Sequence, residues 1–131
     1  MNIVLWSAQC VMAVIFGYSG AFKSTHAKEK ILASGQTGVK WYGIGFIRFI
    51  ALCELIGCAG LVLPWLLGTA RMLTPIAASG LAIIMVGAAG SHWRLARAGG
   101  ERGTREWANV ITNIVLLASC LLVAIGRAAT L

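Results

Sequence analysis

Charged residues are scarce in this chain, and aspartate is absent from it. Only 11% of its 131 residues are charged and 59% are hydrophobic, whereas about 25% of the residues in an ordinary soluble domain are charged. The mean hydropathy, +0.84, is correspondingly high. This composition excludes an ordinary soluble globular domain and indicates an integral membrane protein in contact with the lipid bilayer.

Cysteine and histidine are too few and too scattered to predict a redox or metal centre. The four cysteines form no CxxC pair, and the five residues from Cys53 to Cys58 turn a helix by about 140°. The two histidines, His26 and His92, fall in different segments. We therefore expect no metal site. No haem, flavin or iron–sulfur motif is evident, so no cofactor is expected from motifs alone.

Four apolar runs are long enough to cross a hydrocarbon core of about 30 Å. They cover residues 3–22, 43–67, 72–91 and 108–126. No stretch remains that could build a separate soluble domain, so we predict an all-α membrane protein, a four-transmembrane-helix bundle in one domain over residues 1–131. The first run has no Lys or Arg before it, unlike a secretory signal, and we expect it to be retained as a helix.

The net charge of +7 belongs to the connections between the runs and does not indicate nucleic-acid binding. Eight basic residues lie in two of these connections: Lys23, Lys28, Lys30, Lys40, Arg94, Arg97, Arg102 and Arg105. Only Arg71 and Arg127 lie on the opposite side. The positive-inside rule therefore places connections 23–42 and 92–107 in the cytoplasm and both termini outside.

The connections also contain local signals for helix ends. Residues 25–34, followed by Gly35, predict a short amphipathic helix with Ile31 and Leu32 on the membrane. Thr74 and Pro75 are predicted to be the N-cap and first-turn residues of the third long helix, and Thr104 to cap the fourth.

Small residues predict where the helices approach one another. The second run contains Cys53, Gly57 and Gly60, and the third contains Gly80, Gly87 and Gly90. Small residues of this kind let membrane helices pack closely. We expect both sets to form packing surfaces.

The second run is the only one with formal charges, Arg48 and Glu54. Arg48 lies near the predicted boundary and can extend its guanidinium to water, but Glu54 lies about 12 to 16 Å deep. Their separation of about 240° around the helix rules out a same-face pair. Glu54 therefore needs a partner on another helix, or a proton.

The other helices supply polar side chains at the same end of the bundle. Lys23 closes the first run, His92 closes the third, and Asn109, Thr112 and Asn113 form a stripe at the start of the fourth. A polar pocket reaching from the basic side towards Glu54 is therefore predicted. Gln9 is expected to reach the interior from the opposite half.

Each of these residues has a structural alternative. Glu54 could bond to the fourth helix purely to hold the bundle together, although charges inside membrane spans usually serve function. Lys23 could anchor the first helix at the boundary, and the two asparagines could serve as interhelical hydrogen-bonding groups.

Several motifs around these residues resemble the DoxX-like family of small bacterial four-helix membrane proteins. They are SGxxK at 19–23, R-x5-E-x2-G-x2-GL-x-LP at 48–64, TPxAA at 74–78, and the closing His92. The similarity covers about residues 5–92 closely, while the fourth helix matches only in general character.

The resemblance implies a four-helix fold in the bacterial inner membrane and a link to quinones. The family takes its name from a membrane subunit associated with a terminal quinol oxidase, and related proteins are linked to thiosulfate:quinone oxidoreduction or oxidative-stress complexes. Most members have no assigned activity, and kinship of fold does not transfer chemistry.

Two functions fit these observations. The favoured one is an accessory membrane protein that binds a lipophilic, quinone-like molecule and supports a redox partner. The alternative is an intramembrane isomerase, cyclase or epoxide-opening enzyme. In that enzyme Glu54 would be the general acid and base, oriented by Asn109 or Asn113, with Arg48 or His92 stabilising negative charge.

The other acids, Glu29, Glu101 and Glu106, are expected in loops and would not compete with Glu54. A transporter is disfavoured because four short helices leave little room for an alternating-access path. A homo-oligomer would remove that objection.

Overall fold

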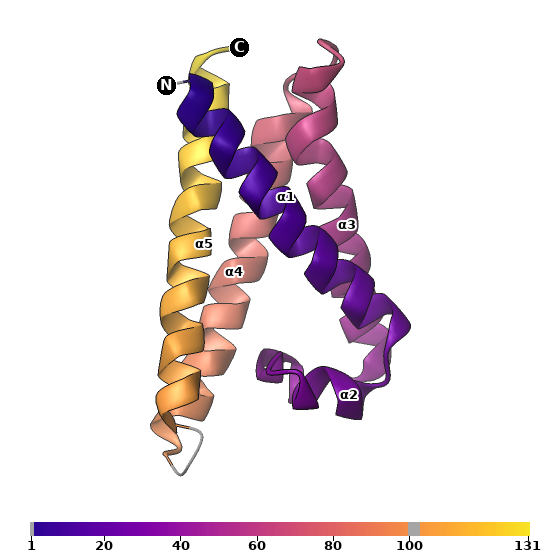
Figure 1. Ribbon diagram of the computed structural model, residues 1–131, viewed down its shortest axis with the longest axis vertical. Helices are drawn as coiled ribbons and strands as arrows, with labels where there is room; N and C mark the ends of the chain where they lie inside the picture. Colours follow the sequence, from indigo (N-terminus) through magenta and orange to yellow (C-terminus); the bar gives the residue numbers. More distant parts are fainter. Residues whose placement is uncertain (1, 100–102) are drawn as a thin grey trace.

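The computed structural model describes residues 2–99 and 103–131 and contains six helical elements (Figure 1). The four long helices are α1 (Asn2–Thr25), α3 (Ile44–Leu66), α4 (Leu73–Arg97) and α5 (Gly103–Ala129). Between α1 and α3 lie the short helix α2 (Lys28–Ala33) and the 3₁₀ turn η1 (Thr37–Val39). The predicted all-α class and four-helix bundle are confirmed.

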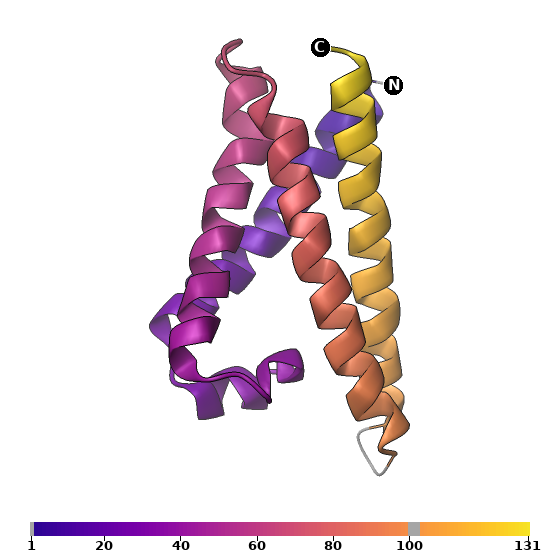
Figure 2. The same cartoon turned by 180° about the vertical axis from the view of Figure 1, so that it is seen from behind.

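The long helices pack in a ring in which α1 contacts α3 and α5, and α4 contacts α3 and α5. Both termini lie at one end of the bundle, and α2 with η1 lies at the other (Figure 1). Seen from behind, α3 separates from α4 and α5 towards the α2 end (Figure 2). The α2–η1 connection lies across this wider end.

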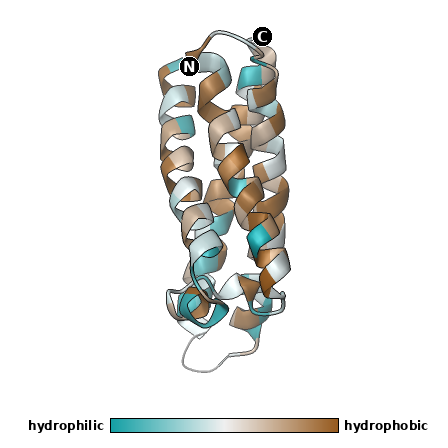
Figure 3. Ribbon diagram, turned by 90° about the vertical axis from the view of Figure 1, so that its right-hand side faces the viewer, coloured by the Kyte–Doolittle hydropathy of each residue, from teal (hydrophilic) through white to brown (hydrophobic). Residues whose placement is uncertain are grey.

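The outer surface of the bundle is suited to lipid. All four long helices are long and apolar enough to cross a membrane, and hydrophobic residues cover most of their length (Figure 3). Large apolar side chains such as Ile83, 73% exposed, and Ile125, 70% exposed, point outward. In water such a surface would be strongly unfavourable; in a bilayer it is expected, so the chain is a multi-pass membrane protein.

Two clusters of buried apolar residues fill the interior. The larger lies towards the termini and joins α1, α3, α4 and α5 through residues such as Phe16, Leu61 and Leu81. The smaller consists of Ile31, Val39 and Ile47 and fixes α2 and η1 against α3. A short helix was predicted over residues 25–34, and the structure has one at Lys28–Ala33. The prediction that Ile31 faces the membrane was wrong, because Ile31 is fully buried within the protein.

Close packing of α3 against α4 depends on the glycines of α3 only. A Cβ atom on Gly57 would lie 2.8 Å from the Leu81 side chain, and one on Gly60 would lie 2.7 Å from the Ala77 Cβ. The glycines of α4 were wrongly predicted to pack in this way. No described atom outside their own helix backbone lies within 4 Å of a Cβ at Gly80, Gly87 or Gly90, because α4 presents Ala77 and Leu81 to α3.

Helices α4 and α5 both extend beyond their apolar runs. Helix α4 continues six residues past the predicted end to Arg97, and α5 includes Gly103, five residues before the predicted start. Alanine, leucine and arginine favour helix even where the sequence is no longer apolar. Thr104 therefore lies inside α5 and is not its cap, and Glu106 lies in a helix and not in a loop. Glu101 and Arg102 lie outside the described residues.

At the termini, a buried arginine connects three helices. Arg127 of α5 is 1% exposed, and it donates hydrogen bonds from Nε to Gln9 Oε1 (2.6 Å) and from Nη1 to Asn2 Oδ1 (2.8 Å). Its guanidinium lies 4.1 Å from the centre of the Trp65 ring on α3, a favourable cation–π geometry. The Gln9 amide in turn donates to the Leu61 carbonyl.

The hairpin between α3 and α4 is stabilised by a side-chain bond that a proline makes necessary. Pro64 has no N–H, so the Gly60 carbonyl four residues earlier loses its helical donor. The Thr74 hydroxyl donates to that carbonyl at 2.8 Å. Thr74 lies inside α4, whose N-cap is Met72. Its predicted role as the N-cap was therefore wrong.

We expect Thr74→Val to lower the free energy of unfolding by about 1 to 2 kcal/mol, because it leaves the partly buried Gly60 carbonyl unsatisfied without changing volume. Thermal unfolding in detergent would measure this. Thr130→Val is the matched control, since Thr130 is exposed and its hydroxyl bonds to carbonyls in the last turn of α5, the helix it directly follows. Equal midpoints for the two variants would contradict the role of Thr74.

Candidate functional site

A cavity of about 390 Å³ lies in the half of the bundle nearest α2. Apolar side chains from all four long helices form most of its wall: Ile15, Phe16, Phe46, Ile47, Ile50, Ile83, Ile84, Met85 and Leu116. Residues of the α2–η1 connection, including Gln36 and Val39, also line it. Ile15, Phe46 and Ile83 are also among the exposed large apolar residues, so the cavity wall includes side chains that the rest of the chain does not cover.

The cavity wall contains a buried ion pair between α1 and α3. Lys23 Nζ lies 2.9 Å from Glu54 Oε1, and both residues line the cavity. Glu54 is 1% exposed, and its second oxygen, Oε2, has no hydrogen-bond partner among the described residues. The ion pair with Lys23 occupies Oε1, so the second oxygen of Glu54 remains available for a further hydrogen bond.

Arg48 supports this pair from outside the cavity. Its Nη1 donates a hydrogen bond to the backbone carbonyl of Lys23, which is one of the last carbonyls of α1 and has no helical donor of its own. The guanidinium thus fixes the end of α1 against α3. Arg48 is not part of the cavity wall.

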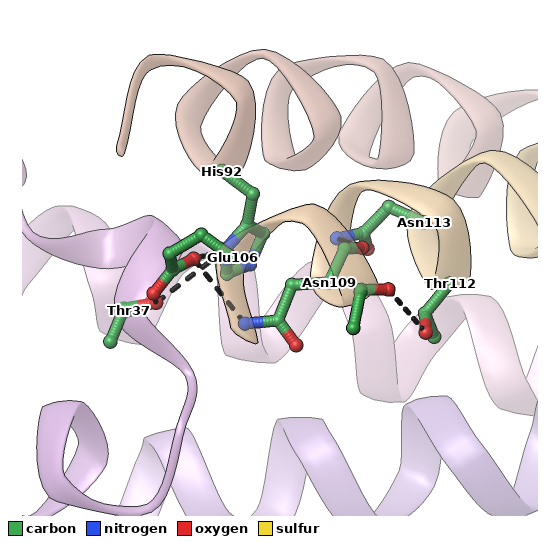
Figure 4. A network of polar contacts seen from close by, with 7 residues as sticks. Thr37, His92, Glu106, Asn109, Thr112 and Asn113 are labelled. Carbon is green, nitrogen blue, oxygen red and sulfur yellow. Dashed lines mark hydrogen bonds and ion pairs between the residues drawn. The ribbon is translucent and has the colours of Figure 1, made fainter. Parts of the chain in front are cut away.

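A second polar cluster joins α4, α5 and η1 (Figure 4). His92 Nδ1 lies 2.6 Å from Glu106 Oε2, Thr37 donates to Glu106 Oε1 at 2.5 Å, and the Asn109 amide donates to Glu106 Oε2 at 3.3 Å. Glu106 is 3% exposed. The carboxylate accepts only, so Nδ1 of His92 carries the proton between them, and Nε2 remains for other contacts.

His92 and Asn109 line the cavity, whereas Glu106 lies behind them. This arrangement gives His92 a fixed orientation, because its ring is held by a carboxylate on one side and approached closely by Gly38 on the other. A Cβ atom at Gly38 would lie 3.0 Å from His92 Nε2. The backbone of the connection therefore lies close to the imidazole only because residue 38 is glycine.

Glu106 was missed as a site residue because the fourth helix was predicted to begin at 108. Glu106, Asn109 and Asn113 are spaced i, i+3 and i+7 and so share one helix face. The signal was therefore present: the asparagine stripe continues one turn towards the N-terminus. The same extension shows that the chain has a second buried acid besides Glu54.

The structure brings five of the seven predicted site residues to one cavity. Their roles in binding or chemistry remain predictions. The five are Lys23, Glu54, His92, Asn109 and Asn113. Arg48 lies beside the cavity, and Gln9 lies near the termini, where it bonds with Arg127.

Chemically, the cavity combines an apolar volume with hydrogen-bonding groups of both kinds. Glu54 can accept, Lys23 can donate, and His92 can do either according to its protonation. Within residues 2–99 and 103–131, no group of three or more His, Cys, Asp or Glu residues is arranged to hold a metal ion.

Comparison with known proteins gives one match. The model of the DoxX-like family matches residues 7–124, a range that includes all five cavity-lining site residues. No curated protein and no solved structure matches the chain.

The ion pair makes a prediction about stability. Lys23→Met should lower the free energy of unfolding by about 3 kcal/mol or more, because it leaves the Glu54 carboxylate buried without a counter-charge. Adding Glu54→Leu to that variant should recover most of the loss. Thermal unfolding of both variants in detergent, with the exposed Lys30→Met as control, would measure the effect. Equal midpoints for the single and double variants would show that the two charges are not coupled.

Proposed function

The chain belongs to the DoxX-like family, and on that premise we propose that it binds a lipophilic, quinone-like small molecule in this cavity and supports a membrane redox partner. The ligand's apolar body would lie among the isoleucines and phenylalanines of the wall. Its polar head would lie against Lys23 and Glu54.

The observation that carries this proposal is an apolar cavity within a membrane bundle that contains a few buried polar groups. Small-molecule sites typically have such a volume, an apolar lining and a small number of polar groups that fix orientation. A bundle selected for packing alone gains nothing from a cavity of this size, because unfilled space costs stability. The exposed wall residues Ile15, Phe46 and Ile83 would let a molecule enter from the bilayer.

The accessory role is supported by the family resemblance and by the state of the charged groups. Glu54 is already paired with Lys23, and Glu106 is already bonded to three side chains. Groups held in this way suit binding and orientation. A redox partner would supply the electron-transfer chemistry for which no motif is evident in this chain.

We further propose that the protein lies in the cell's inner membrane, with the α2 end of the bundle on the cytoplasmic side and both termini on the opposite side. Five basic residues in the described part of the chain lie at the α2 end: Lys28, Lys30, Lys40, Arg94 and Arg97. At the other end Arg127 is buried, which leaves Arg71 as the exposed basic residue among those described. The positive-inside rule favours this orientation.

A second candidate function is an intramembrane enzyme acting on a lipophilic substrate. The observation in its favour is the His92–Glu106 pair, because a histidine oriented by a carboxylate is a common general base. Glu54 would then act on the substrate as a second proton-transfer or electrostatic group. The reaction class would be isomerisation, cyclisation or epoxide opening.

Native mass spectrometry of gently solubilised protein tests the binding function. We expect wild type to retain a small lipophilic molecule, and Glu54→Gln to retain at least about tenfold less of it, since a neutral amide binds a polar head more weakly than a carboxylate. Glu29→Gln is the matched control because Glu29 is exposed on α2. A molecule-free wild type, or equal retention in all three proteins, would count against the proposal.

Deuterium labelling separates the enzyme from the accessory protein. If His92 transfers protons to or from carbon, the molecule incubated with wild type in D₂O should gain deuterium at a non-exchangeable position, and His92→Gln should abolish the gain. An accessory protein leaves the molecule unlabelled. Labelling that persists in His92→Gln would remove this residue from the chemistry.

A further inference from the structure

The ion pair in the cavity wall has unused hydrogen-bonding capacity of two kinds. Glu54 lines the cavity, and its Oε2 atom is buried with no hydrogen-bond partner among the described residues. Lys23 carries three N–H donors, and its Nζ makes one hydrogen bond to the described part of the chain, to Glu54 Oε1. An acceptor and donors therefore lie at the same point of the wall.

An acceptor oxygen left unsatisfied in an apolar interior is costly. The cost is avoided if the cavity's occupant donates a hydrogen bond to it. This requirement distinguishes between polar heads that would otherwise fit the same volume.

We propose that the cavity selects lipophilic molecules whose head group is a hydroxyl, either alcoholic or phenolic. The hydroxyl would contact Glu54 Oε2 and Lys23 Nζ at the same time. This inference rests on the proposed function, because it names the class of ligand for the same cavity. The hydroxyl hydrogen is donated to Glu54, and the hydroxyl oxygen accepts from Lys23.

Other head groups satisfy only half of the site. A quinone carbonyl, an ether or an ester accepts from Lys23 and leaves Glu54 Oε2 without a donor. A carboxylate or phosphate is repelled by Glu54, and an ammonium group by Lys23. Of a quinone and its hydroquinone, the site therefore prefers the reduced, hydroxyl-bearing form.

The second polar cluster does not make the same selection. Glu106, the acid of that cluster, accepts from Thr37 and Asn109 and bonds with His92. Its oxygens are both in use and lie behind His92. Recognition of the hydroxyl is therefore assigned to Lys23 and Glu54.

The test compares matched hydroxyl and methyl-ether forms of two probes: farnesol with farnesyl methyl ether, and geranylhydroquinone with its dimethyl ether. Each pair competes for wild-type protein in the same detergent micelles, and bound probe is quantified by native mass spectrometry. We expect the hydroxyl form to bind at least about tenfold more tightly, because hydrogen bonds to charged groups are the stronger ones.

Three variants control the comparison. Lys23→Met with Glu54→Leu should bind both members of a pair alike, which also corrects for their unequal partition into micelles. Glu54→Gln keeps the side-chain volume and should reduce the preference for the hydroxyl form over the methyl ether. If the double variant fails to fold, Glu54→Gln alone tests the role of the carboxylate. Glu29→Gln should keep the wild-type preference.

The outcomes distinguish a failure of hydroxyl selection from a failure of the proposed binding function. Equal binding of the two forms by wild type, as expected if a water molecule satisfies Glu54 Oε2, would overturn hydroxyl selection and leave lipophile binding intact. A preference that persists in the double variant and in Glu54→Gln would place recognition elsewhere and overturn the assignment. If no probe of either pair binds to wild type, the proposed function fails together with the inference.

Discussion

The Lys23–Glu54 ion pair is the constraint on which the rest of the structure depends. A carboxylate about halfway through a membrane helix must have a counter-charge, and the nearest one is supplied by the last turns of α1. The pair fixes where α1 crosses α3, and Arg48 reinforces the crossing through the Lys23 carbonyl. Towards the termini from this point the bundle is closely packed; towards α2 it widens and encloses the cavity.

Polar networks hold both ends of the bundle, because lipid supplies no hydrophobic drive between membrane helices. Near the termini, Arg127, Gln9 and Asn2 connect α1 with α5, and the Trp65 ring adds α3. At the α2 end, Glu106 connects Thr37 of η1 with His92 of α4. The second network also holds the α2–η1 connection across the wide end of the bundle, so that the cavity has a wall there.

The same residues explain why binding is the best-supported function. A cavity in a membrane protein could be a packing defect, but a packing defect need not contain a buried carboxylate with an unused oxygen. The charged pair, the histidine fixed by Glu106 and the apolar wall are the features on which the proposed binding of an amphiphilic small molecule rests. Membership of the DoxX-like family agrees with the membrane location of the chain, and the class of ligand is argued from the cavity alone.

The sequence by itself determined the membrane class, the four helices and the burial of Glu54, because apolar run length and the cost of a buried charge are local properties of the chain. It also contained Glu106 on the asparagine face, although the helix start was placed too late to show it. Only the tertiary structure decided that Glu54 pairs with Lys23 and that Gln9 meets Arg127, 118 residues away. These pairings depend on the angles at which helices cross and on how far apart they lie, and side-chain packing along the whole bundle sets both.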